Sequence, residues 1–450
     1  MEKKNELYRG KTKAVYTTED PNLVILENFD SLTKFDNPEL TKEMKGKAVR
    51  ATKTTCNVFN LLKSAGIPVA FERQISETEF LAKKCQMIPL EVIIRRYAVG
   101  SYLKRFPHLA KPEGMPPHRF HQLVFELFLK TTGGEIKDFD GRVLDNTLVD
   151  DPFISKKNDE WSLYHPKKPS WEEGADLGIS IRLLDFLYSE KEISEKVNEE
   201  GDNSILLLEK VIEDIEKVTR TTFLVLEGAW AQFGCRLIDF KIEFGITSDG
   251  NLVVSDVIDN DSWRLRTSDW SELSKENFRQ NMNLEEVSDK YELVAGLTDR
   301  FHKSKQAIVF WRESKNDVLP ELDKEMFAMW GISFVEIIVS GYKSPRLCLN
   351  KLEEVIAEFP EGGVIIPIVG MSNGLGPTLS ARTSWPVLAV PANSNENQID
   401  VWSSLSMPSR VPLLTVLSPK NAILAALNIL GQKNPFVYAV RQYDLEELDE

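Results

Sequence analysis

The sequence contains little cysteine and none of the spacing that cysteine chemistry uses. Only four of its 450 residues are cysteine, and no two of them form a CxxC pair. Such scattered thiols are typical of reduced cytosolic proteins and argue against a disulfide framework or a zinc site. We therefore expect a cytoplasmic protein. The four residues are Cys56, Cys85, Cys235 and Cys348.

Positive charge and long apolar runs are also scarce. The chain carries 55 lysines and arginines against 69 acids, for a net charge of −14 and a pI of about 5.1. This balance argues against a nucleic-acid-binding surface. No apolar run approaches the roughly 20 residues of a membrane span, and the first residues, MEKKNE, lack the apolar core of a signal peptide. We expect a globular protein of two or three domains, with neither nucleic acid nor membrane as a partner.

Acidic residues are concentrated where two strands are expected to end. Residues 237–245 alternate apolar and polar side chains, which predicts a strand with its charges on one face. A turn at 248–251 leads into a second apolar run, so an antiparallel pair is expected. Glu243 and Asp256 then face each other, and two carboxylates with nucleotide phosphates suit Mg²⁺. Lys241 shares the face. The alternative is a solvated sheet face of an acidic protein.

Two basic stretches are candidate anion sites. Residues 10–13, Gly-Lys-Thr-Lys, predict a turn between strands whose backbone and lysines can contact phosphates, although the Walker A spacing is absent. A surface hairpin is the alternative there. Residues 87–105 predict a buried strand followed by a Gly-Ser turn among four cations, a combination that can hold phosphate and carboxylate groups. An exposed basic edge strand is the alternative.

The periodicities divide the chain into parts. Helices are expected at 47–64, 205–218 and 223–233, and 131–180 is expected to be a long surface excursion with little regular structure. From residue 306 strands alternate with helices, which predicts a parallel three-layer α/β domain with its sites beyond the carboxyl ends of the strands. The expected parts are a first domain over 1–267, a helical connector over 268–304, a second domain over 305–432 and an acidic tail over 433–450.

Several of these stretches together resemble one family. The first half contains GKTK at 10–13, ExxxRRxAxGSxxKR at 91–105, DFKIEFG at 239–245 and DVIDNDSWRL at 256–265. The second half contains SNGLGP at 372–377, DVWSSL at 400–405 and TVLSP at 415–419. In this order they resemble the animal bifunctional enzymes of purine biosynthesis. These enzymes join phosphoribosylaminoimidazole-succinocarboxamide (SAICAR) synthase to phosphoribosylaminoimidazole (AIR) carboxylase. The resemblance implies a two-lobed α+β ATP-binding fold followed by a parallel αβα domain.

The resemblance also implies an activity and a set of site residues. The synthase family ligates aspartate to carboxyaminoimidazole ribotide with ATP and Mg²⁺, through an acyl phosphate that the aspartate amine attacks. Carried over by position, the ATP contacts are Gly10, Lys11, Lys13 and Lys241, and the metal ligands are Glu243 and Asp256. The catalytic set is Lys13, Lys241, Asp256 and Arg264. The substrate contacts are Asp36, Arg95, Ser101, Lys104, Arg105, Asp261 and Arg264. Residues 30–47 and 131–180 depart from the family pattern.

The second domain departs from its family at the reacting groups. Where the family has a glycine loop, GSxSD, this chain has Arg312-Glu313-Ser314-Lys315-Asn316, and Glu313 would repel a phosphate. Where the family has a proton-transferring histidine in SAHK, this chain has Tyr342, whose pKa near 10 suits that task poorly. We expect a carboxylase fold that has lost its activity and supports a homo-octamer, as the family does. The altered site comprises Ser314, Lys315, Asn316, Tyr342, Lys343, Ser372 and Gly374.

Three functions remain open at this stage. The first is an ATP-dependent ligase with an inactive carboxylase-like domain. The second is a fully bifunctional enzyme, and the third is a non-catalytic paralogue that binds purine intermediates or scaffolds other enzymes. The lysines and acids retained in the first half argue against the third.

Overall fold

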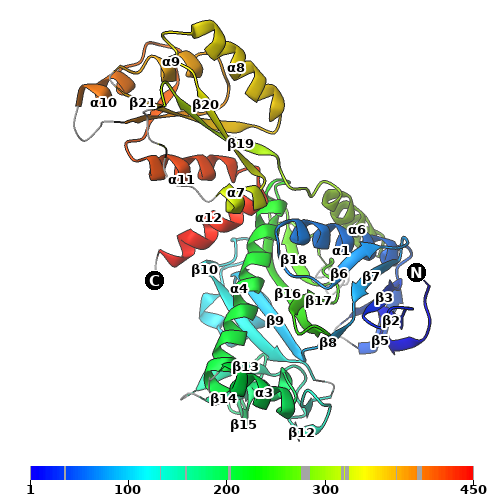
Figure 1. Ribbon diagram of the computed structural model, residues 1–450. Coiled ribbons are helices and arrows are strands. Elements are labelled where there is room, and N and C mark those ends of the chain that lie inside the picture. The colour runs from blue at the N-terminus through cyan, green and yellow to red at the C-terminus, as the bar shows by residue number, and fades with distance from the viewer. Residues whose placement is uncertain are drawn as a thin grey trace. The chain divides into compact units, whose positions relative to one another are not determined.

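The chain folds as two compact units, Met1–Phe301 and His302–Leu448, seen in the computed structural model (Figure 1). The structure describes residues 2–34, 37–131, 133–157, 160–200, 204–274, 284–315, 319, 324–370, 372–392 and 398–448. No helix within these residues is long and apolar enough to cross a membrane.

The first unit begins with an antiparallel sheet that one helix covers. The five strands lie in the order β1-β2-β3-β7-β6. Helix α1 (Lys47–Ser64) has the predicted bounds, and it buries Val58, Phe59 and Leu62 against this sheet. The Phe59 ring stacks on Phe71 of β6 at 5.6 Å. The strands are β1 (Glu6–Arg9), β2 (Lys13–Thr17), β3 (Leu23–Asn28), β6 (Phe71–Gln74) and β7 (Glu79–Lys83).

The second sheet of this unit is organised around β16 (Arg236–Thr247). This strand pairs antiparallel with β9 along one edge and with β8, β17 and β18 at its ends. The main path runs β15-β14-β13-β10-β9-β16-β17. An isolated parallel β-bridge pairs Val69, just before β6, with Val254 of β17. The remaining strands are β8 (Cys85–Met87), β9 (Leu90–Tyr97), β10 (Arg119–Leu129), β13 (Phe153–Lys157), β14 (Glu160–Tyr164), β15 (Asp176–Ile181), β17 (Leu252–Ser255) and β18 (Trp263–Arg266).

A single long helix, α4 (Ser204–Ala231), replaces the two helices expected at 205–218 and 223–233. It packs against β9, β10 and β16 (Figure 1). The expectation of a break was wrong because residues 219–222 contain neither glycine nor proline. Thr219 and Thr222 are fully buried, and the Thr219 hydroxyl donates to the Ile215 carbonyl at 2.5 Å, which keeps the polar group satisfied within the helix.

The excursion over 131–180 contains regular structure, contrary to expectation. Its first part forms the hairpin of β11 (Glu135–Lys137) and β12 (Val143–Asn146). Its second part forms β13, β14 and β15, which extend the second sheet beyond β10. These strands are short and rich in charged residues, so their periodicity is weak in the sequence. The smaller elements of this unit are β4 (Ser31–Lys34), β5 (Asn37–Glu43), α2 (Ser101–Arg105), α3 (Glu190–Glu200) and two 3₁₀ turns at Pro107–Leu109 and Leu183–Phe186.

The expected connector belongs to the first unit. Its helix, α6 (Leu284–Thr298), packs on α1 and buries Val287, Tyr291 and Val294. The ion pair between Arg50 and Glu292, at 2.7 Å, joins the two helices at their exposed edge. The buried apolar stripe explains why this helix docks on α1 rather than linking two bodies through solvent.

The second unit has the predicted parallel sheet. Its five strands lie in the order β20-β19-β21-β22-β23, and every neighbouring pair is parallel. The central strand β21 (Gly363–Val369) is buried along its whole length, as the continuous apolar run predicted. The other strands are β19 (Gln306–Arg312), β20 (Ile332–Ile338), β22 (Val387–Pro391) and β23 (Leu413–Thr415), and the helices are α7 (Lys324–Met329), α8 (Pro345–Glu358), α9 (Leu375–Ser380), α10 (Gln398–Leu405) and α11 (Pro419–Leu430).

The expected acidic tail is mostly a docked helix, α12 (Pro435–Glu447). The Asn434 side chain caps it by accepting from the N–H groups of Phe436 and Val437. Pro435 occupies the first helical position, where proline fits best, and the side chains of Phe436 and Val437 are buried. The acids at the end of the chain obscured this start signal and the apolar residues that follow it.

Candidate active site

Strands β16 and β17 bring the two predicted metal ligands to neighbouring positions. Alternation along β16 places Asp239, Lys241 and Glu243 on one face. Glu243 pairs with Ser255 at the end of β17, and Asp256 follows immediately. Asp256 has a φ of +64°, a left-handed conformation that ends the strand and turns the chain away.

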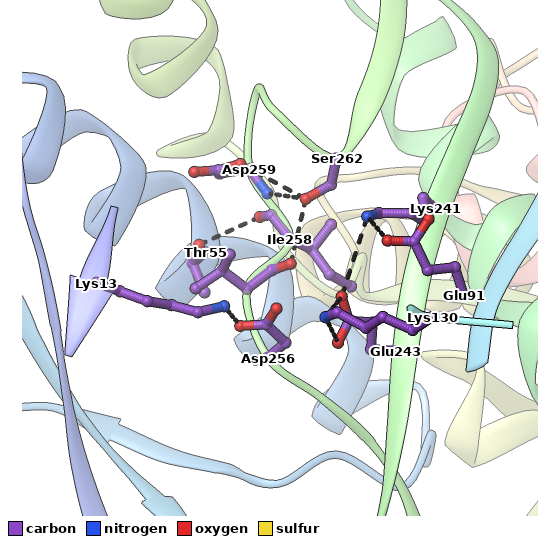
Figure 2. A network of polar contacts seen from close by, with 11 residues as sticks. Lys13, Thr55, Glu91, Lys130, Lys241, Glu243, Asp256, Ile258, Asp259 and Ser262 are labelled. Atoms are coloured by element: carbon purple, nitrogen blue, oxygen red, sulfur yellow. Dashed lines mark hydrogen bonds and ion pairs between the residues drawn. The ribbon is translucent and has the colours of Figure 1, made fainter. Parts of the chain in front are cut away.

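The loop after β17 is held by its own polar groups. The Thr55 hydroxyl, from α1, donates to the Ile258 carbonyl at 3.3 Å, and the Ser262 hydroxyl donates to the Val257 carbonyl at 3.1 Å (Figure 2). The Asp259 carboxylate accepts from the Asp261 N–H at 2.8 Å. These bonds fix the backbone that carries Asp256.

Lysines from three different strands converge on these acids (Figure 2). Lys13, at the start of β2, forms an ion pair with Asp256. The Nζ atom of Lys130, just past β10, lies 2.7 Å from both oxygens of Glu243. Lys241 Nζ lies 2.5 Å from Glu91 and 4.0 Å from Glu243. The result is an alternating cluster of cations and carboxylates, which we call the lysine–carboxylate cluster: Lys13, Glu91, Lys130, Lys241, Glu243 and Asp256.

Burial and neighbouring charges shift the pKa values in this cluster. Burial lowers the pKa of Lys13 to about 8, with Glu243 opposing the shift. Burial acts against the charged form of Lys241 as well, but Glu91 and Glu243 outweigh it and raise its pKa above the ordinary value. Burial opposes ionisation of Glu243, yet Lys130 and Lys241 lower its pKa. Glu243 is therefore ionised at neutral pH, as metal and phosphate chemistry requires.

Two cluster residues were missed by the sequence interpretation. Glu91 lies within the quoted arginine motif, but its partner Lys241 is 150 residues away. Lys130 follows the apolar end of β10 and precedes the excursion. The only local signal for a role of Lys130 was its position as a single cation after a buried strand. Lys11 is exposed in the turn between β1 and β2, where the Gly10 N–H donates to the Lys13 carbonyl at 2.9 Å.

A second network links the predicted arginines through shared carboxylates. Asp239 accepts from Arg95 and, at 2.6 Å, from Arg264. Gly100, with a φ of +60°, lies under the Arg264 guanidinium, and a Cβ atom there would approach its Nη2 to 2.6 Å. Only glycine combines this backbone conformation with this close approach. Ser101 follows directly and begins α2.

The remaining predicted substrate contacts differ in their exposure to solvent. Lys104 is exposed, whereas Arg105 is only 4% exposed and pairs with Glu126. The Arg105 guanidinium lies 4.4 Å from the Phe153 ring centre, so this ring and Glu126 cover it, and its contact with substrate stays a prediction. Arg95 is also buried, at 2% exposed, and it supports Asp239 rather than facing solvent. The aromatic cover comes from the excursion, whose packing local sequence does not reveal.

Asp261 is held by two buried groups. The Nζ atom of Lys47, which is 2% exposed, lies 3.1 Å from Asp261, and the Tyr291 hydroxyl of α6 donates to it at 2.5 Å. Asp261 and Asp259 raise the pKa of Lys47 despite its burial. Asp36, the last of the predicted contacts, lies outside the described residues.

The donor chemistry at the cluster fits Mg²⁺ better than it fits a transition metal. Within the described parts of the chain, no three histidine, cysteine or acidic side chains converge as a metal-binding group. Mg²⁺ requires fewer protein ligands, because it keeps several waters and binds through one or two carboxylates together with phosphates. Glu243 and Asp256 are suitable for this role, provided that their lysine partners turn toward the phosphates.

Comparisons with known proteins identify the family of this chain. The family model for SAICAR synthetase matches residues 6–141 and 182–296, and the model for AIR carboxylase matches residues 308–447. The human bifunctional phosphoribosylaminoimidazole carboxylase/phosphoribosylaminoimidazole succinocarboxamide synthetase is 33% identical over 96% of this chain and 92% of its own. This chain belongs to that bifunctional family of purine biosynthesis. The Drosophila melanogaster member is 31% identical over 96% of this chain and 90% of its own.

The synthetase domain also has relatives that lack the second domain. The phosphoribosylaminoimidazole-succinocarboxamide synthase of Pseudomonas fluorescens is 32% identical over 66% of this chain and 97% of its own. The whole bacterial protein therefore corresponds to little more than the first unit. Residues 142–181, which include β13, β14 and β15, lie outside the synthetase family model.

The carboxylase domain places its altered residues at one edge of the sheet. Ser314 and Lys315 follow β19, Tyr342 and Lys343 follow β20, and Ser372 and Gly374 follow β21. Because these strands are parallel neighbours, the residues lie together beyond their carboxyl ends. Asn316 lies outside the described residues.

Tyr342 covers the glycine loop of this edge. Its hydroxyl lies 3.0 Å from the Ser372 hydroxyl, and a Cβ atom on Gly374 would come within 2.1 Å of the tyrosine ring. The first loop differs from a glycine loop as well, because Arg312 forms an ion pair with Glu336 and donates to the Lys315 carbonyl at 3.2 Å. The side chains of Arg312 and Tyr342 thus lie at the carboxyl ends of the neighbouring strands β19, β20 and β21.

Proposed function

We propose that the first unit is an ATP-dependent ligase that joins aspartate to carboxyaminoimidazole ribotide and forms SAICAR. The observation that carries this proposal is the lysine–carboxylate cluster at the junction of β2, β10, β16 and β17. Its charges suit a nucleotide triphosphate and a divalent cation. Family membership supports the same reaction, since the names of the relatives state it for those proteins.

The cluster has the right charges for phosphoryl transfer. Lys13, Lys241 and the exposed Lys11 are the groups that contact the ATP phosphates. When they turn toward phosphate, Glu243 and Asp256 are released to hold Mg²⁺. Bound Mg²⁺ would supply neutralisation of the charge on the transferring phosphoryl group. Since positioning and electrostatic stabilisation carry most of such catalysis, the strand positions matter more than any proton-transfer group.

The arginine network serves the other substrate. Arg264 and Ser101 border the Gly100 turn, and they are the groups that hold the phosphate and carboxylate of the ribotide. Arg95 acts indirectly, because it is buried and fixes Asp239, which in turn orients Arg264. Asp36, Lys104 and Asp261 remain proposed contacts for the amino-acid or ribotide groups.

An in vitro assay tests the ligase proposal. The full chain, supplied with ATP, Mg²⁺, aspartate and carboxyaminoimidazole ribotide, is expected to form SAICAR with equimolar release of ADP. Omission of aspartate or chelation of the metal should abolish the product. A folded protein that binds ATP and Mg²⁺ without forming product would instead support the non-catalytic alternative.

We also propose that the carboxylase domain has lost its activity. A tyrosine occupies the family's histidine position, and its ring covers Gly374 in the third loop of this edge. CO₂-dependent consumption of aminoimidazole ribotide should therefore stay at background. Turnover that a Tyr342→Phe change abolishes would support the alternative, a fully bifunctional enzyme.

The carboxylase domain retains a surface suited to self-association. Large apolar side chains are exposed along α10, β23 and the loop after it, and exposed apolar surface of this kind marks protein interfaces. We propose a cytoplasmic homo-octamer assembled through this domain. Sedimentation of the full chain tests the assembly: an octamer is expected, and a monomer at micromolar concentration would contradict it. The exposed residues are Trp402, Leu405, Leu414 and Leu417.

A further inference from the structure

The excursion between β10 and β13 leaves and re-enters the sheet at one point beside the lysine–carboxylate cluster. It departs after Lys130 and returns at Pro152, whose carbonyl accepts from the Leu129 N–H at 3.0 Å. Asp151 Oδ1 accepts from the Thr131 N–H at 3.0 Å, and Thr131 Oγ1 accepts from the Asp151 N–H at 3.0 Å. These two bonds form a reciprocal clasp at the base of the excursion.

The clasp lies next to the lysine that neutralises Glu243. Thr131 directly follows Lys130, whose N–H donates to the Pro89 carbonyl at 2.9 Å and whose Nζ contacts both oxygens of Glu243 at 2.7 Å. The backbone around Lys130 is thus fixed by Pro89 on one side and by the clasp on the other. Without the clasp, the chain beyond Lys130 would be held only by the excursion.

Asp151 combines an uncommon backbone conformation with a partly buried carboxylate. Its φ is +49°, in the left-handed region that residues other than glycine, asparagine and aspartate rarely occupy. Its carboxylate is partly buried near Glu91 and Lys241, and burial, followed by the negative charge of Glu91, raises its pKa to about 6. A carboxylate held partly buried beside a like charge is typical of functional sites.

We propose that Asp151, from the segment that the synthetase family model does not match, is a positioning residue for Lys130 and thereby for nucleotide and metal binding at Glu243. The inference rests on the proposed ligase function of this site. The role of the excursion is then to bring Asp151 to Thr131 and so to hold the chain at the end of β10. Asp151 itself touches Thr131 and acts on the reacting groups only through Lys130.

The test compares variants that separate the hydrogen bond from the charge. Asp151→Gly removes the carboxylate but keeps the left-handed backbone, whereas Asp151→Asn removes only the charge and keeps the acceptor. Loss of a hydrogen bond of this kind should raise the ATP concentration for half-saturation about tenfold in Asp151→Gly. Asp151→Asn should retain most of the wild-type affinity. Asp150→Asn is the matched control, because it removes a neighbouring exposed charge and keeps the oxygen that accepts from the Gly134 N–H at 3.1 Å.

Two further variants protect the test. Thr131→Val breaks the other half of the clasp and should raise the half-saturating ATP concentration in the same direction, so it decides the matter if Asp151→Gly fails to fold. In a Lys130→Met background, where nothing remains to be positioned, Asp151→Gly should add no further loss of ATP affinity.

Specific outcomes overturn the inference. One is a lower melting temperature for Asp151→Gly with unchanged ATP half-saturation, which means a purely structural clasp. Another is an equal loss in Asp151→Asn, which means that charge alone matters. A third is a full effect in the Lys130→Met background. Calorimetric titration with ATP and Mg²⁺ gives the same comparison even if the wild type forms no product, so failure of the proposed function is distinguishable from failure of this inference.

Discussion

At the scale of single residues, the site depends on carboxylates and cations that share partners. Asp239 forms ion pairs with both Arg95 and Arg264, and Glu243 forms ion pairs with both Lys130 and Lys241. Removing one partner of a buried pair leaves the other charge uncompensated, which costs far more than loss of an exposed salt bridge. Substitutions in these networks should therefore affect both stability and binding, and conservative changes are needed to separate the two effects.

Gly100 offers a sharp residue-scale test. Gly100→Ala should displace Arg264, because the added Cβ atom would lie 2.6 Å from its Nη2. It should also cost about 1 kcal/mol for the positive φ alone. The expected result is a higher KM for the ribotide with an unchanged KM for ATP. Gly141→Ala, at φ +81° with open space around it, is the control for backbone strain alone. Equal ribotide KM values in the two variants would contradict the role of Arg264.

The raised pKa of Asp151 predicts that the free energy of unfolding depends on pH. Its folded pKa of about 6 lies above the ordinary value of 3.8, so the charged form destabilises the folded state. That destabilisation is fully present above pH 6 and disappears below the unfolded pKa. Asp151→Asn should therefore raise the free energy of unfolding by roughly 1 to 2 kcal/mol at pH 8. The gain should vanish near pH 3.5, measured by urea denaturation at both values. A gain that persists at low pH would show that charge is not its cause.

At the scale of elements, local patterns predicted those whose burial has a simple period. The alternation of β16 and the turn after it predicted the antiparallel pairing with β17, although Glu243 pairs with Ser255 rather than with Asp256. The alternation of strands with helices predicted the parallel sheet. The pairing of β9 and β10 with β16, which brings Glu91 and Lys130 to the site, depends on tertiary register that no local pattern encodes. For the same reason the burial of Arg105 beneath Phe153 was not predictable.

Helix α12 gives a test at this scale. Asn434→Ala removes the side chain that caps the helix and donates to the Trp330 carbonyl at 2.8 Å, and it should lower the free energy of unfolding by about 1 to 2 kcal/mol. Thermal denaturation of the full chain, monitored by calorimetry, measures the effect on the carboxylase domain. Ser418→Ala, at the weaker cap of α11, should cost less. An unchanged transition in Asn434→Ala would mean that α12 contributes little to the domain.

At the scale of the whole molecule, the two units differ in the side chains at their candidate sites. The synthetase domain combines its phosphate-binding lysines with acids suited to a metal. The carboxylase domain keeps its sheet but fills the edge where its site would lie with Arg312 and Tyr342. This arrangement supports our proposal that the domain serves assembly rather than chemistry, since a fold can persist without its function.

The most direct measurement is ATP-dependent SAICAR formation by the Asp256→Asn variant beside the wild type and Asp249→Asn. Asparagine tolerates the left-handed backbone at position 256, so the fold should persist while one metal ligand and the Lys13 ion pair are weakened. Asp249, exposed in the turn between β16 and β17, serves as the control. The account predicts product from the wild type and Asp249→Asn and at least about 100-fold less from folded Asp256→Asn. Equal product formation by all three proteins would contradict it.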